Sequence, residues 1–127
     1  MSSADTPVTP TAFFNIFVTV FPTTGKEGET VYKTHFTPES IDVQQLDTVL
    51  NYQLISPTPE DIRIVEVTIS PDGNEEFSTP SISRSGKLAT FSDANLIDGT
   101  FGVTLHFSDK IGTKFKVDPQ IINRPPA

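Results

Sequence analysis

The sequence predicts an all-β protein, an antiparallel β-sandwich of about seven or eight short strands. Two observations predict this fold class. Apolar residues alternate with period two in several short segments, and turn-forming residues separate these segments. No segment shows the spacing of an amphipathic helix. The 11 Pro and 7 Gly are spread along the chain, as expected where many strands are joined by turns.

The chain length predicts one domain. Domains commonly hold about 100–150 residues, and this chain has 127. Residues 1–11 are rich in Ser, Thr and Pro, and we expect a flexible N-terminal tail there. Residues 12–127 are then a single sandwich domain.

The first predicted strand begins at Ala12 and carries apolar side chains on both faces. Its inward face is expected to hold Phe14, Ile16, Val18 and Val20. The opposite face repeats Phe13, Phe17 and Phe21 beside Asn15 and Thr19. Two interpretations are open. The strand can lie in the middle of the sandwich with both faces covered. Otherwise the three phenylalanines form an exposed aromatic stripe that binds a partner or a second copy.

Further strands follow the same alternation. We expect them at residues 30–36, 41–43, 48–56, 62–70, 87–91, 100–107 and 113–117. In the strand at 62–70, Val65, Val67 and Ile69 are predicted to face inward. Residues 75–86 are expected to be irregular and polar, and residues 118–127 to be a Pro-rich exit. This count of short strands is typical of an immunoglobulin-like sandwich, with a barrel as the main rival.

Charge and cysteine content exclude several function classes. The 16 acidic residues against 9 Lys and Arg give a net charge of −7. A nucleic-acid binder needs a basic face, so no nucleic acid and no anionic membrane surface is expected as a partner. The absence of Cys excludes disulfides, a thiol nucleophile and thiolate metal sites, and agrees with a cytoplasmic location.

The residues that could carry chemistry show no recognisable spacing. His35 and His106 are far apart in the sequence, and no motif links them. Asp72, Asn74 and Glu76 lie at alternate positions around a turn, as calcium ligands can, but the EF-hand pattern is absent, so an acidic turn with solvated loop charges is expected there. We therefore predict no catalytic, cofactor-binding or metal-binding residue, no cofactor, and no enzyme activity.

One basic patch is predicted late in the chain. His106 points outward from its strand, and Lys114 and Lys116 point outward from the next one. The patch can meet an acidic partner. Lysine on an exposed strand also protects a sheet against edge-to-edge aggregation.

The end of the chain contains Asp118, Pro119, Ile121 and Asn123 in the pattern Asp-Pro-x-Ile-x-Asn, directly after two strands and a short turn. This arrangement resembles the closing hairpin of the bacterial DP-EP family. The resemblance implies an immunoglobulin-like fold and no established activity.

The functional expectation is a non-enzymatic module that binds a protein partner or itself, with a homodimer as the simplest case. Its interaction surface would use the Phe13, Phe17 and Phe21 stripe and the basic patch. The alternative is a carbohydrate or small-ligand module. In that case Tyr32 or Tyr52 would be a stacking platform, and the turn at Asp72 a calcium loop.

Overall fold

The structure, a computed structural model, describes residues 7–8 and 10–127. Most of the predicted tail, residues 1–6 and 9, lies outside the described residues. The described chain is all β, with no helix. Its strands are β1 (Phe13–Thr24), β2 (Thr30–Thr37), β3 (Ser40–Val43), β4 (Thr48–Leu54), β5 (Arg63–Ser70), β6 (Ser81–Ile82), β7 (Leu88–Asp93), β8 (Gly99–Ser108), β9 (Lys114–Val117) and β10 (Gln120–Asn123).

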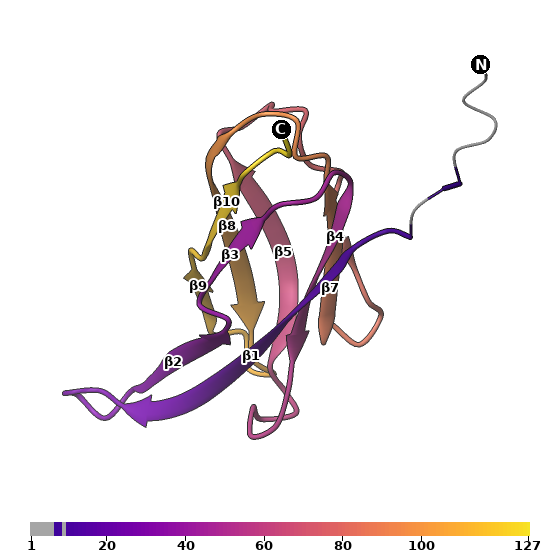
Figure 1. The fold of residues 1–127 in the computed structure, drawn as a ribbon. Coiled ribbons are helices and arrows are strands. Elements are labelled where there is room, and N and C mark those ends of the chain that lie inside the picture. Colours follow the sequence, from indigo (N-terminus) through magenta and orange to yellow (C-terminus); the bar gives the residue numbers. More distant parts are fainter. Residues whose placement is uncertain (1–6, 9) are drawn as a thin grey trace, which may run out of the picture.

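Two sheets pack face to face, which confirms the predicted sandwich (Figure 1). The first sheet has the strand order β2-β1-β4-β7-β6. The second has the order β3-β10-β8-β5, and β9 also pairs with β8. Strand β5 pairs along one edge of the long strand β8. On the other edge, β10 pairs with the first half of β8 and β9 with the second half. Within each strand, successive residues face alternately the core and the outside.

The core is built from the inward positions that the alternation predicted. On β1, Ile16, Val18 and Val20 are at most 1 % exposed. Leu105 and Phe107 of β8 are completely buried on the second sheet. Phe107 stacks on Phe115 with ring centroids 5.0 Å apart. Packing between these two inner faces buries the branched and aromatic residues of the core and holds the sheets together.

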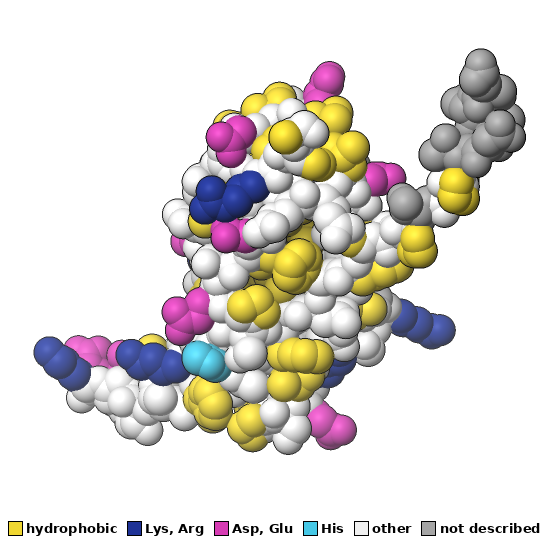
Figure 2. All heavy atoms as spheres, viewed as in Figure 1, with side chains coloured by type: hydrophobic (Ala, Val, Ile, Leu, Met, Phe, Trp, Pro, Cys, Tyr) yellow, Lys and Arg dark blue, Asp and Glu magenta, His cyan; other side chains and the backbone are white. Residues whose placement is uncertain are grey.

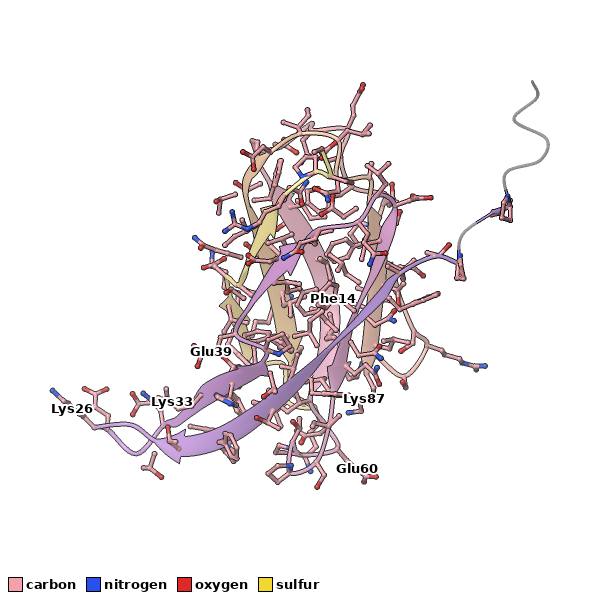
Figure 3. The ribbon with its side chains drawn as sticks, in the orientation of Figure 1. Phe14, Lys26, Lys33, Glu39, Glu60 and Lys87 are labelled. Atoms are coloured by element: carbon pink, nitrogen blue, oxygen red, sulfur yellow. The ribbon has the colours of Figure 1, made fainter. Side chains whose placement is uncertain are left out.

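A two-stranded arm projects from this body. The C-terminal half of β1 and the start of β2 continue beyond the second sheet, and the hairpin tip lies far from the core (Figure 1). In Figure 3, Lys26 marks the tip, and Lys33 lies nearer the body. Residues 21–24 and 26–31 are exposed. A two-stranded ribbon without a covering layer is only marginally stable alone, so the base of the arm needs other contacts.

Tyr32 supplies such a contact. Its ring stacks on Phe115 with centroids 4.5 Å apart. Its hydroxyl donates a 2.7 Å hydrogen bond to Asp109 Oδ2, in the turn between β8 and β9. This hydrogen bond lowers the pKa of Asp109 and raises that of Tyr32 to about 12. The arm is thereby tied to the second sheet.

Two features of the sheets were not predicted. The pairs β1–β4 and β3–β10 are parallel, whereas the six other strand pairs are antiparallel. The short strands β6 and β10 fall in segments expected to be irregular. β10 has only four residues, and it is held by β8 on one side and β3 on the other. Its formation depends on neighbours that are distant in the sequence, which local patterns do not reveal.

The expected inward position of Val65 is wrong. The pairing of β5 with β8 shifts register between Ile64 and Glu66, so a β-bulge inserts one residue there. Ile64 and Val67 are buried, and Val65 is 41 % exposed. Strict alternation places Val65 with Val67, but the bulge reverses the faces.

Candidate functional site

The outer face of the first sheet is the main candidate surface. Phe13, Phe17 and Phe21 are 65 %, 40 % and 41 % exposed, whereas Ile16, Val18 and Val20 on the other side of β1 are buried. The outer face of β1 is therefore not covered by another layer, and the three phenylalanines form an exposed stripe. Large aromatic side chains in a row along one strand are unusual on the free surface of a monomer.

A ladder of uncharged polar side chains lies beside the stripe. Asn15 Oδ1 accepts hydrogen bonds from Asn51 Nδ2 at 3.1 Å and from Gln53 Nε2 at 3.3 Å. Thr90 Oγ1 donates to Asn51 Oδ1 at 2.8 Å. These bonds connect β1, β4 and β7 across the face, and they fix the side chains in a flat array.

No strand position on this face is acidic, although the chain has 16 Asp and Glu. The face includes a basic margin, Lys33 and His35 on β2, opposite Phe21 and Thr19 of β1. By alternation and pairing, the other positions are Phe13, Asn15, Phe17, Thr23, Val31, Thr37, Val49, Asn51, Gln53, Ser81, Leu88, Thr90 and Ser92. The outer face of the first sheet is thus uncharged at its centre, where aromatic side chains lie beside polar amides and hydroxyls.

The predicted basic patch lies on the second sheet. His106 of β8 is directly opposite Lys116 of β9, and Lys114 is two residues away on the same face. Glu66 Oε1 lies 3.9 Å from His106 Nε2, so an acidic neighbour is part of the patch. These residues line a shallow hollow of about 300 Å³. The patch and the aromatic stripe belong to opposite faces of the sandwich, and the structure does not bring them together.

A buried polar cluster at one end of the sandwich was not predicted. It consists of Glu76 in the β5–β6 loop, Asp93 at the end of β7, Asn95 in the β7–β8 loop, and Asn123 at the end of β10. Glu76 is 5 % exposed and the other three are completely buried. The expectation that Glu76 is a solvated loop charge is wrong, because its side chain turns inward to bond the next loop.

The Glu76 carboxylate organises this cluster. Its Oε2 accepts hydrogen bonds from the backbone N–H of Leu96 at 2.9 Å and of Ile97 at 3.0 Å. Asn123 Nδ2 donates to Glu76 Oε2 at 2.8 Å and to Asp93 Oδ1 at 3.1 Å. One amide from the second sheet therefore joins a carboxylate at the end of β7 and a carboxylate in the β5–β6 loop.

Asp93 is the electrostatically costly member. Burial raises its pKa to about 6, partly offset by hydrogen bonds from the Asn95 backbone and the Asn123 side chain, and the nearby Glu76 charge raises it further. Three oxygen atoms of the cluster have no hydrogen-bond partner: Asp93 Oδ2, Asn95 Oδ1 and Asn123 Oδ1. Buried polar atoms without partners are uncommon in folded proteins.

A mostly apolar hollow of about 610 Å³ adjoins the cluster, and Glu76 is part of its wall. Leu96 and Ile97, 69 % and 61 % exposed, and Phe101 also line it. Figure 2 shows hydrophobic side chains gathered at this upper end of the molecule, with acidic groups around them. The β7–β8 loop lies at the same end in Figure 1.

Several residues considered from the sequence are placed elsewhere. Tyr52 is completely buried, so it cannot be a stacking platform. At the turn, Asn74 Oδ1 accepts from the Glu76 backbone N–H, and the predicted calcium loop with Asp72 does not form because the Glu76 side chain points inward. His35 lies on the first sheet and His106 on the second. Within the described residues, no three His, Cys, Asp or Glu side chains group as metal ligands.

The fold defines a class of protein: a β-sandwich domain with an exposed aromatic stripe on a sheet face that has no carboxylate at its strand positions. The family model for the DP-EP family matches residues 14–125, so the chain belongs to the DP-EP family. The resemblance seen in the Asp118 to Asn123 motif is thereby confirmed. No curated protein matches the chain. In the part of the chain that the structure describes, no helix is long and apolar enough to cross a membrane.

Proposed function

We propose that this protein is a non-enzymatic association module that forms a homodimer through the outer face of its first sheet. The observation that carries the proposal is the exposure of Phe13, Phe17 and Phe21 along one strand of an otherwise well-packed sandwich. Fully burying an exposed phenylalanine side chain stabilises by about 1.5–3 kcal/mol. These three are 40–65 % exposed, so covering them on each subunit contributes a part of that amount for each ring.

The size of the face supports a weak dimer. From Phe13 to Phe21 the strand extends about 27 Å, at about 3.4 Å for each residue. Near Phe17 the four strands β2, β1, β4 and β7, spaced by about 4.8 Å, give a width of roughly 20 Å, and the face narrows to β1 and β2 at Phe21. Such a face buries at most on the order of 500 Å² on each subunit, near the lower limit for a specific interface. We expect a dissociation constant on the order of micromolar.

A second copy of this chain fits the shape and charge of the surface. A flat sheet face is complemented by another flat sheet face, as in the packing of sheets within sandwiches. The chain carries a net charge of −7, yet this face has no carboxylate at its strand positions. Two copies can therefore meet here without bringing carboxylates together, provided that the Lys33 and His35 margins stay at the rim of the interface. The same net charge supports a protein partner over nucleic acid or membrane, and the absence of Cys agrees with a cytoplasmic location.

Solution mass as a function of protein concentration tests the proposal. Light scattering is expected to show a reversible shift from monomer to dimer. The double variant Phe13→Ser, Phe17→Ser should remain folded, because both side chains are exposed, and should be monomeric throughout. Ile111→Ser is the matched control: Ile111 is 80 % exposed but lies in the β8–β9 turn, so its loss should leave dimerisation unchanged. A wild-type protein that stays monomeric at every concentration would overturn the proposal.

A second candidate, a neutral carbohydrate ligand, is favoured by the amide ladder. Asn15, Asn51 and Gln53 present hydrogen-bonding groups beside exposed aromatic rings, which suits a sugar with hydroxyl groups and an apolar ring face. NMR titration with neutral oligosaccharides distinguishes this case. Shifts of the Asn51 and Gln53 side-chain amides in a monomeric protein would support it, and unchanged spectra would exclude the sugars tested.

A further inference from the structure

We propose that the end of the sandwich formed by the β5–β6 and β7–β8 loops binds a protein segment in which a large apolar side chain is flanked by Lys or Arg. The binding surface consists of the mostly apolar hollow at this end and of the exposed side chains of Leu96 and Ile97. These residues are different from those of the outer face of the first sheet, so this surface is separate from the one proposed for the homodimer.

Two consecutive large apolar side chains project from the β7–β8 loop beside the hollow. Leu96 and Ile97 are 69 % and 61 % exposed, and the wall of the hollow also includes Pro71 and Phe101. The hollow has a volume of about 610 Å³. Ligand-binding hollows in proteins commonly measure about 300–1,000 Å³ and are lined mainly by apolar side chains. This one therefore has room for a large apolar side chain of a partner.

The Glu76 carboxylate fixes the backbone that carries these two side chains. Both of its oxygens accept the Leu96 backbone N–H, at 3.2 and 2.9 Å, and Oε2 also accepts that of Ile97 at 3.0 Å. The Asn123 amide nitrogen lies between Glu76 and Asp93 and donates to both carboxylates. The loop is thus bound to the body of the sandwich through its own N–H groups, and its apolar side chains remain on the outside.

Asn95 anchors the same loop from within. Its φ of 57° is a left-handed conformation, which asparagine adopts more readily than most other residues with a side chain. Its Nδ2 donates to the carbonyls of Val43, Gln45 and Arg124, at 3.0, 3.3 and 3.3 Å. Because the loop is held by segments far apart in the sequence, it loses little conformational entropy when a partner binds.

This arrangement lowers the stability of the protein by itself. Asp93, Asn95 and Asn123 each contain one buried oxygen without a hydrogen-bond partner. Leu96 and Ile97 remain largely in contact with water, so their apolar surface contributes little to folding. Local structure that is unfavourable for folding but rigidly held is typical of binding sites, where it positions the contact residues.

The charges around the hollow favour a basic partner. Glu75 lies in its wall, and Asp72 and Asp98 are exposed in the same two loops. Figure 2 shows acidic side chains around the apolar surface at this end. Arg124, which also reaches this end, is paired with Asp42 at 3.4 Å. Lys or Arg beside the apolar residue of a partner would be attracted here, whereas a second copy of this acidic chain would be repelled.

Selection from a peptide library tests the proposal. Random peptides displayed on phage are selected on the folded full chain, and an enriched peptide is then synthesised and titrated by NMR. We expect enriched sequences to share a large apolar residue flanked by Lys or Arg, and the peptide to shift the amide signals of Leu96 and Ile97. Its affinity should fall as salt is added, because the acidic groups are exposed. No enriched peptide, or shifts confined to the outer face of the first sheet, would overturn the proposal.

Two apolar variants locate the peptide. Leu96→Ser and Ile97→Ser keep the backbone N–H groups that bind Glu76, so both should fold, and each should weaken peptide binding at least tenfold. Ile111→Ser is the matched control, because Ile111 is 80 % exposed but follows the other end of β8. It should bind like the wild type. Unchanged binding in both loop variants would refute the site.

A charge variant tests the choice of a basic partner. Glu75→Gln should weaken binding of the peptide about two- to fivefold, as expected for the loss of an exposed ion pair. Glu60→Gln removes an exposed carboxylate at the opposite end of the molecule (Figure 3) and should have no effect. Tighter binding by Glu75→Gln would contradict the basic partner. Loss of the dimer in Leu96→Ser or Ile97→Ser, measured by light scattering, would place a second copy here and overturn the proposal as well.

Discussion

The two tyrosines of this protein are predicted to respond in opposite directions to loss of the hydroxyl group. Tyr52 is completely buried between rings, with its centroid 5.9 Å from that of Phe91 and 6.4 Å from that of Phe36. Its hydroxyl has no hydrogen-bond partner, and burial raises its pKa. A buried hydroxyl without a partner costs about 1–3 kcal/mol. Tyr52→Phe removes that cost and keeps the ring, so the free energy of unfolding should rise by about 1–2 kcal/mol.

Tyr32→Phe is the matched comparison, because it removes the same hydroxyl group from a tyrosine whose hydroxyl does donate a hydrogen bond, to Asp109. This variant should be less stable than the wild type, and the arm should lose part of its attachment to the second sheet. Urea unfolding followed by circular dichroism measures both changes, with unchanged denaturant dependence as the sign that only stability differs. A Tyr52→Phe variant that is clearly less stable than the wild type would show that the hydroxyl has a partner. The reasoning from its burial would then be refuted.

Two further predictions concern the Asp109 turn and the β5 bulge. Because the Tyr32 hydrogen bond lowers the pKa of Asp109, its stabilisation should be present above the ordinary carboxyl pKa and be lost as the pH falls through the lowered value. Tyr32→Phe should therefore resemble the wild type most closely at acid pH, as thermal melts across the acid range can check. Val67→Thr should cost about 1–2 kcal/mol, because it places a hydroxyl in the core, whereas Val65→Thr should cost less than about 0.5 kcal/mol. Equal costs in urea unfolding would contradict the bulge.

Local sequence patterns predicted most of the sandwich. The period-two alternation on β1, β4 and β8 placed Val18, Leu50 and Val103 in the core, where the structure has them. Alternation works there because one face of each strand is buried and the side chain period is two. It failed at Val65, because the β-bulge there belongs to the pairing of β5 with β8, and that pairing has no local signal in the sequence. The strand β10 was missed because four residues after a proline carry too little pattern.

The candidate sites divide in the same way. The stripe of Phe13, Phe17 and Phe21 could be read from the spacing on one strand, but whether another layer covers it depended on the packing of the sheets. The cluster around Glu76 and Asp93 had no local signal except Asn123 in the Asp-Pro-x-Ile-x-Asn motif. Its members are separated by up to 47 positions, the distance from Glu76 to Asn123.

By itself, the sequence determined the all-β class, the inward face of most strands, the acidic charge and the family-like motif at the end of the chain. These properties depend on residue type and on the two-residue period of a strand, which act locally. Only the tertiary structure decided which aromatic face is exposed, which strands run parallel, and which polar side chains meet at the end of the sandwich. These properties depend on contacts between distant segments, because burial and hydrogen bonding are set by the neighbours that folding brings together.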